Sequence, residues 1–150
     1  MEGMFNHIVV ATDFSECSQR ALDVALELAA KFGSKLTLVH SWEPPSYSYA
    51  AGTYVTVDLL TPIEQAAVAE LDRATAELKT RMPTAQSMIR SGVAWEEILS
   101  GAALVHADLI VLGTHGRRGM ARAIIGSVAE KVVRLATMPV LTVHGTASAK

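Results

Sequence analysis

The sequence lacks the features that mark several large classes of protein. Cys17 is the single cysteine, so no internal disulfide can form, and no Cys-x-x-Cys pair or histidine at metal-ligand spacing accompanies it. No apolar run approaches the roughly 20 residues of a membrane-spanning helix, and the first residues contain neither a basic segment nor a long apolar stretch. These absences predict a reducing, cytoplasmic environment and no membrane partner.

A strong excess of charge of either sign is also missing. Thirteen basic and fifteen acidic side chains leave a formal net charge of −2, which provides no broad electrostatic footprint for nucleic acid or anionic lipid. The sequence therefore predicts no nucleic-acid partner. Any anionic ligand has to be bound by a local arrangement of groups.

Hydrophobic residues make up half of the 150 positions, enough for one globular domain with its own core. Short β-branched runs typical of buried strands alternate with segments whose apolar residues recur at helical spacing. The expected strands are 6–12, 35–41, 85–91, 107–114 and 139–143, and the expected helices are 16–32, 61–82, 93–106 and 127–138. This alternation predicts a single α/β domain over 1–150, an open parallel sheet with helices on both faces.

Local signals predict where some of these elements begin and end. Ser15 is expected to cap the first helix and Gly33 to end it, while the segment 61–64, TPIE, is a capping box with proline at the first helical position. Residues 43–60 are rich in proline, serine and tyrosine without helical period, and they predict a mobile loop. Residues 145–150 are expected to form a C-terminal tail.

The stretch GTHGRRGMARAIIGS follows the fourth expected strand and carries an unusual glycine pattern. Gly113 and Gly116 stand three apart, and Gly126 follows ten residues later with Ser127 directly behind it. In open α/β sheets, ligands bind beyond the carboxyl ends of the strands. Glycines there let backbone N–H groups turn toward a phosphate, and a helix that begins at Ser127 adds its own free donors. The alternative is structural, with glycines that only end a strand and start a helix.

Two well-known phosphate motifs do not match this stretch. It contains no G-x-x-x-x-G-K-[ST], so it has no P-loop lysine. The glycines also follow the fourth strand rather than the first, which excludes the dinucleotide fingerprint.

The residues on both sides of the glycines resemble the universal stress proteins, specifically their ATP-binding branch. The resemblance runs from HIVVATDFSECSQRALDVALELAAKFGSKLTLVHSWEP to ADLIVLGTHGRRGMARAIIGSVAEKVVRLATMPVLTV, and the pattern G-x2-G-x9-G-[ST], the nucleotide signature of that family, is complete. The resemblance implies a Rossmann-like three-layer α/β/α sandwich with a five-stranded parallel sheet in the order 3-2-1-4-5. It also implies a nucleotide that lies across the ends of strands one and four.

The same resemblance implies a set of nucleotide-binding positions. Thr12 and Asp13 match residues that line the adenosine and metal side of the pocket, and Ser41 matches the position whose backbone reads the adenine edge. The strand-end, ribose and phosphate contacts correspond to Leu112, Gly113, Gly116, Gly126, Ser127 and Val128.

The chemistry of the polar residues agrees with a nucleotide site. Asp13 could coordinate Mg²⁺ or Mn²⁺ through water or hold a ribose hydroxyl, and its structural alternative is an Asx-type turn before the helix. Arg117, together with Arg118 and Arg122, is expected to screen phosphate charge, against the alternative of a solvated basic face. We expect no catalytic role for His115.

We therefore expect an ATP-binding regulatory or stress-response protein. The sequence offers no firm catalytic base or nucleophile, and both the SGG-x-D-S loop of pyrophosphate-releasing ATPases and the H-I-G-H signature are absent. The alternatives are a slow ATPase or phosphotransferase and a nucleotide-independent dimeric scaffold. The resemblance implies a homodimer paired through the strand at 139–143, since an exposed edge invites pairing, unless the C-terminal tail covers that edge.

Overall fold

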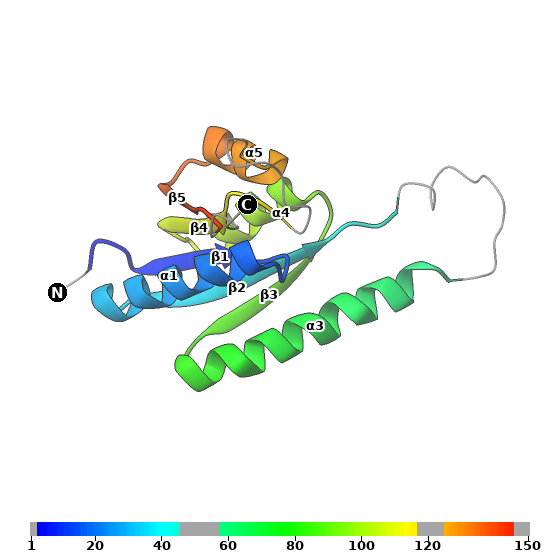
Figure 1. Ribbon diagram of the computed structural model, residues 1–150, viewed down its shortest axis with the longest axis horizontal. Helices are drawn as coiled ribbons and strands as arrows, with labels where there is room; N and C mark the ends of the chain where they lie inside the picture. The colour runs from blue at the N-terminus through cyan, green and yellow to red at the C-terminus, as the bar shows by residue number, and fades with distance from the viewer. Residues whose placement is uncertain (1–2, 46–57, 117–124, 146–150) are drawn as a thin grey trace, which may run out of the picture.

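Five parallel strands form the centre of the computed structural model, which describes residues 3–45, 58–116 and 125–145. The strands are β1 (His7–Ala11), β2 (Lys35–Trp42), β3 (Gln86–Ser91), β4 (Leu109–Gly113) and β5 (Val140–Val143). They lie in the order β3-β2-β1-β4-β5 (Figure 1), which confirms the expected topology. The expected mobile loop and tail lie largely outside the described residues.

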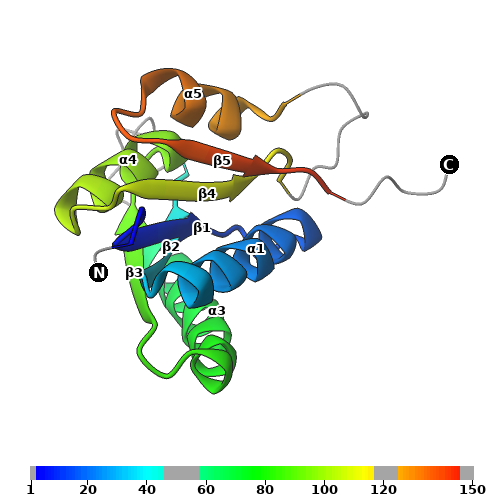
Figure 2. The same cartoon turned by 90° about the vertical axis from the view of Figure 1, so that its left-hand side faces the viewer.

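The four helices cover both faces of this sheet. They are α1 (Glu16–Phe32), α3 (Leu60–Arg81), α4 (Ala94–Leu104) and α5 (Ser127–Leu135). Figure 2 shows α1 and α3 on one side of the strands and α4 and α5 on the other. None of these helices is long and apolar enough to cross a bilayer.

The central strand β1 is buried on both faces because its apolar residues serve two separate cores. Ile8 and Val10 pack in the cluster on the side of α1 and α3, whereas Val9 and Ala11 pack in the cluster on the side of α4 and α5. This two-residue alternation is the pleat of a strand in the middle of a parallel sheet. It fixes the end of β1 firmly between its neighbours.

The caps of α1 follow the sequence prediction. The Ser15 hydroxyl oxygen accepts a hydrogen bond from the Ser18 N–H at 3.2 Å, and Gly33 ends the helix in the left-handed conformation with φ of 68°. The beginning of the helix therefore has a defined position next to the end of β1.

Two helix boundaries differ from the prediction. Asp58 rather than Thr61 caps α3, because its carboxylate lies one turn earlier and accepts hydrogen bonds from the N–H groups of Leu60 and Thr61 at 3.1 Å each. These bonds, led by that from the Thr61 hydroxyl, lower the pKa of Asp58. At the other boundary, α5 ends at Leu135, where the chain becomes extended at Ala136 before it enters β5.

Candidate functional site

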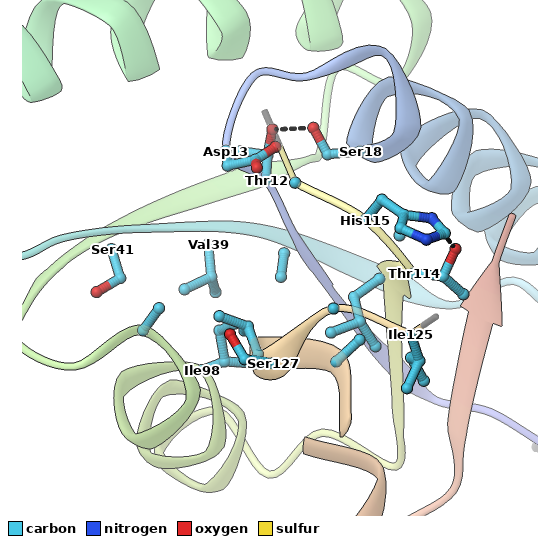
Figure 3. A pocket seen from close by; sticks show the side chains of 18 residues that line it. Thr12, Asp13, Ser18, Val39, Ser41, Ile98, Thr114, His115, Ile125 and Ser127 are labelled. Carbon is cyan, nitrogen blue, oxygen red and sulfur yellow. Dashed lines mark hydrogen bonds between the residues drawn. The ribbon is translucent and has the colours of Figure 1, made fainter. Parts of the chain in front are cut away.

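A cavity of about 500 Å³ lies at the carboxyl ends of β1 and β4, between the sheet and α4 and α5 (Figure 3). Its size falls in the range of small-molecule pockets. Every predicted site residue that the structure describes lines it: Thr12, Asp13, Ser41, Leu112, Gly113, Gly116, Gly126, Ser127 and Val128. Arg117, Arg118 and Arg122 lie outside the described residues.

The topology explains why a cavity opens at this place. β1 and β4 are hydrogen-bonded neighbours, with Val10 beside Val111. The chain leaves β1 through α1 on one face of the sheet, and it leaves β4 toward α5 on the opposite face. The two connections diverge, which creates a crevice at the point where the strand order reverses.

Thr12 is the first residue after β1, and its backbone and hydroxyl groups make polar contacts with residues of β2 and of the start of α1. Its N–H donates to the Val39 carbonyl at 2.9 Å, and its own carbonyl oxygen lies 2.8 Å from the His40 Nδ1. Its hydroxyl oxygen accepts from the Phe14 N–H at 3.0 Å and lies 3.1 Å from the Ser18 hydroxyl. The loop after β1 therefore has a well-defined backbone.

Asp13 forms the Asx-type turn that the sequence offered as an alternative, and it also lines the cavity. One carboxylate oxygen accepts the Ser15 N–H at 3.0 Å, which is the Asx-type turn. The other oxygen lies so close to Gly116 that a Cβ on that glycine would be 2.7 Å away from it. Asp13 thus closes the turn, lines the cavity and contacts the loop that follows β4.

Gly113, Gly116 and Gly126 are the glycines of the signature, and none of them has a positive φ. Their role is to leave room for neighbouring atoms where a side chain would not fit. A Cβ on Gly113 would lie 2.7 Å from the Cys17 sulfur, and a Cβ on Gly126 would lie 2.9 Å from the Thr114 carbonyl oxygen. The Gly126 N–H also donates to that oxygen at 2.6 Å. Close packing therefore explains these glycines better than the left-handed turns that glycine commonly serves.

Ser41 places a backbone donor and acceptor at one end of the cavity. Thr12 N–H donates to Val39, the last β2 residue in register with β1, whereas β2 itself continues to Trp42. Backbone groups on alternate residues of a strand point to the same side. The N–H and carbonyl of Ser41 therefore face the side that β1 has left, while its hydroxyl donates to the Gly92 carbonyl at 3.1 Å.

Apolar side chains form much of the remaining wall. Figure 3 shows Ser41, Val39 and Ile98 toward one end of the cavity and Thr114 and Ile125 toward the other. The lining residues that sequence reasoning missed are Ala11, Ser18, Val39, Ala94, Ile98, Thr114, Ile125 and Ala129. Thr114 and Ile125 lie inside the glycine-rich stretch, which drew attention mainly to its glycines. The apolar members on strands and helices have spacing that also fits ordinary core positions, so the sequence carried no signal that singled them out.

The first turn of α5 supplies donors to the cavity. Ser127, Val128 and Ala129 line it, and they are the first residues of a helix whose cap, Gly126, offers no side chain. The first N–H groups of a helix have no partner within the helix, and they carry partial positive charge. An anionic group in the cavity would find these donors already oriented.

The single carboxylate of the site suits a metal ion that substrate phosphates also coordinate, rather than one held by protein ligands alone. Asp13 is the only carboxylate among the lining residues that the structure describes. The described chain also has no group of three His, Cys, Asp or Glu side chains that could hold a metal. Mg²⁺ is commonly held by one or two carboxylates together with substrate phosphates, and Asp13 fits that arrangement.

His115 also lines the cavity, next to Thr114. Its Nδ1 lies 3.0 Å from the Thr114 hydroxyl oxygen, and its Nε2 is buried without a hydrogen-bond partner in the described structure.

This chain is similar to proteins of one known family in both sequence and fold. The model of the universal stress protein family matches residues 4–144. Universal stress protein A homolog 1 of Coxiella burnetii is 33% identical over 141 residues, which are 93% of this chain and 96% of that protein.

Two solved structures share the fold and carry bound nucleotides. A universal stress protein in complex with cAMP has a TM-score of 0.67 at 28% identity, and the match covers 93% of this chain and 97% of that chain. The universal stress protein from Archaeoglobus fulgidus in complex with dAMP has a TM-score of 0.61 at 27% identity, with 93% and 98% of the two chains covered.

Proposed function

The chain belongs to the universal stress protein family, and on that basis we propose that its cavity binds ATP together with Mg²⁺ or Mn²⁺. In this proposal the bound nucleotide stabilises one conformation or assembly, so that the protein acts as a nucleotide-dependent regulator in the stress response. The cytoplasm, where ATP is abundant, is the proposed location. Two relatives of similar fold that bind the adenine nucleotides cAMP and dAMP support the ligand class.

The backbone of Ser41 is the observation that carries the proposal. Its N–H and carbonyl face a part of the cavity whose walls include Val39 and Ile98. Adenine offers an acceptor, N1, beside a donor, the N6 amino group, so one residue's N–H and carbonyl match that edge. Guanine presents acceptor and donor in the opposite order. In the same orientation it would place donor against donor, and the site should prefer adenine.

The start of α5 suits the phosphates. The first N–H groups of α5 at Ser127 and Val128 are donors for an anion. Gly116 and Gly126 let the backbone come close without side chains in the way. Asp13 is placed to hold a ribose hydroxyl or a water of the metal ion, and the bound Mg²⁺ would supply charge neutralisation of the phosphates. We infer that Arg117 adds further positive charge.

We also propose that two copies pair through the outer edge of β5. β5 is the last strand of the sheet, and Leu141 on it and Leu135 near the end of α5 are large exposed apolar side chains. An unpaired edge with apolar neighbours is a template for another strand. A dimer of this kind would lie beside α5, whose first turn lines the cavity.

Release of bound nucleotide from the purified protein tests the proposed function. After denaturation we expect adenine nucleotide in the supernatant. Added Mg-ATP should raise the melting temperature of the nucleotide-free protein, since ligand at about 100 times its Kd stabilises by about 2.7 kcal/mol. Mg-GTP serves as the matched control and should give a much smaller shift. The absence of both adenine nucleotide and a shift with Mg-ATP would refute the proposal.

A further inference from the structure

His40 precedes Ser41 on β2, but its side chain lies on the opposite face of the sheet from the cavity. Val39 packs in the core beside α4 and α5, whereas Leu38 packs in the core beside α1 and α3. Since side chains alternate along a strand, His40 lies on the face of Leu38. There its ring lies against the loop that joins β1 to α1, in contact with Thr12 and Phe14.

The contact between His40 and Thr12 has a defined direction. The Thr12 carbonyl oxygen can only accept a hydrogen bond, so the His40 Nδ1, 2.8 Å away, has to carry the proton. The Thr12 N–H is already bonded to Val39. Both backbone groups of Thr12, the residue directly before Asp13, are therefore tied to β2.

Phe14, on the other side of Asp13, has a backbone conformation that needs support. Its φ is 65°, in the left-handed region that bulky residues rarely adopt. Such strain persists only where the surroundings hold it, and it concentrates at functional sites. The Phe14 ring packs on the core and lies with its centroid 4.4 Å from that of His40, at an interplanar angle of 49°. His40 thus contacts the residues on both sides of Asp13.

We propose that His40 is a positioning residue for the nucleotide site. It holds the Thr12 carbonyl and the Phe14 ring, so that the Asp13 carboxylate lies beside Gly116 before the ligand arrives. The proposal rests on nucleotide binding by this cavity. Its physical basis is preorganisation: a loop that is already ordered loses less freedom when the ligand binds.

The variant His40→Leu removes the donor and keeps an apolar side chain of moderate size. We expect its Kd for Mg-ATP, measured by calorimetric titration, to rise about five- to tenfold, the effect of one lost hydrogen bond. His40→Asn should restore most of the affinity, because the amide nitrogen of asparagine can take the place of Nδ1. The matched control is His7→Leu. His7 is also a strand histidine, with a 2.8 Å contact to the Thr37 hydroxyl, but it begins β1, at the end of the strand away from the cavity.

A double-mutant cycle with Asp13→Asn separates positioning from a general loss of structure. If His40 acts through Asp13, His40→Leu should weaken binding far less in the Asp13→Asn background than in the wild type. Equal effects in both backgrounds would overturn the inference. If His40→Leu does not fold, His40→Met, which also lacks the donor, replaces it in the same cycle, with the same expected and contrary results.

The outcome also distinguishes this inference from the proposed function. A wild-type protein that does not bind Mg-ATP refutes both. A wild-type protein that binds, together with a folded His40→Leu variant of unchanged affinity, refutes only the role of His40.

Discussion

At the scale of single residues, the missing side chain of Gly116 determines where the carboxylate of Asp13 can lie. A Cβ at position 116 would be 2.7 Å from the Asp13 Oδ2. That oxygen lies at the end of a side chain, which can shift more easily than backbone can. We therefore expect a side chain at position 116 to affect the proposed binding more than folding.

Gly116→Ala should displace the Asp13 carboxylate and weaken Mg-ATP binding by about tenfold, or about 1.4 kcal/mol. Its free energy of unfolding without ligand should change little. Gly33→Ala is the matched control: φ of 68° makes alanine costly there, by about 1 kcal/mol, but the nucleotide affinity should not change. Titration calorimetry and urea unfolding measure the two properties. Unchanged affinity in Gly116→Ala would argue against a role for Asp13 in the site.

His7 makes the stability depend on pH. Burial, followed by the charge of Lys35, lowers the pKa of His7 despite the opposing effect of Asp108. The unfolded chain therefore takes up a proton more readily than the folded protein does. The free energy of unfolding has its full value at pH above the His7 pKa of the unfolded chain. It declines as the pH falls from that value toward the lowered His7 pKa of the folded protein.

His7→Gln should reduce this pH dependence, because glutamine can reach Thr37 but does not titrate. Between about pH 7.5 and about pH 5.5, the free energy of unfolding should fall more for the wild type than for His7→Gln. Urea unfolding at a series of pH values measures the difference. Parallel profiles for the two proteins would show that His7 has no part in the dependence.

At the scale of elements, Ser15 at the start of α1 both caps the helix and contacts Asp13 in the candidate site. The Ser15 hydroxyl caps the helix through the Ser18 N–H, while the Ser15 N–H donates to Asp13. The variant Ser15→Ala loses the first bond and keeps the second.

We expect Ser15→Ala to lower the free energy of unfolding by about 1 kcal/mol. Ser87→Ala, at an exposed position of β3, is the control and should stay within about 0.5 kcal/mol of the wild type. Chemical denaturation measures both. If Ser15→Ala is as stable as the control, the cap contributes nothing in solution.

The elements also show what the sequence could predict and why. Ser15 and Gly33 were recognised because their cap chemistry depends on residue type and local spacing. The TPIE pattern at 61–64 misplaced the cap of α3, because Asp58, three residues earlier, is also a cap-forming residue and its carboxylate accepts the first N–H groups of the helix.

The candidate site was predictable only in part. The glycine signature and the resemblance located the ends of β1, β2 and β4, and the described members of that prediction all line the cavity. Ala94 and Ile98 were missed because an apolar residue of α4 looks the same whether it faces a ligand or a core. The contact between Gly116 and Asp13 and that between His40 and Thr12 join distant segments, and no local pattern encodes them.

At the scale of the whole molecule, the backbone groups of β5 point alternately toward β4 and toward the outer edge of the sheet. The carbonyl groups of Pro139 and Val143 accept hydrogen bonds from Ile110 and Thr114 on the β4 side. Because the direction alternates along a strand, the N–H of Thr142 points away from β4, toward the open edge.

Thr142→Pro should therefore abolish the proposed dimer while it spares the hydrogen bonds between β4 and β5, since proline removes only the outward donor. Thr142→Val keeps the N–H and is the matched control. Sedimentation velocity should show a monomer for the first variant and a dimer for the second. A dimeric Thr142→Pro protein would place the interface elsewhere.

Titration of the nucleotide-free protein with Mg-ATP in a calorimeter tests most directly whether the cavity is a nucleotide site. We predict saturable binding with a single site per chain, weakened in Asp13→Asn and much weaker when Mg-GTP replaces Mg-ATP. Absence of saturable binding by the folded wild-type protein, or equal affinity for both nucleotides, would contradict the assignment of this cavity to ATP.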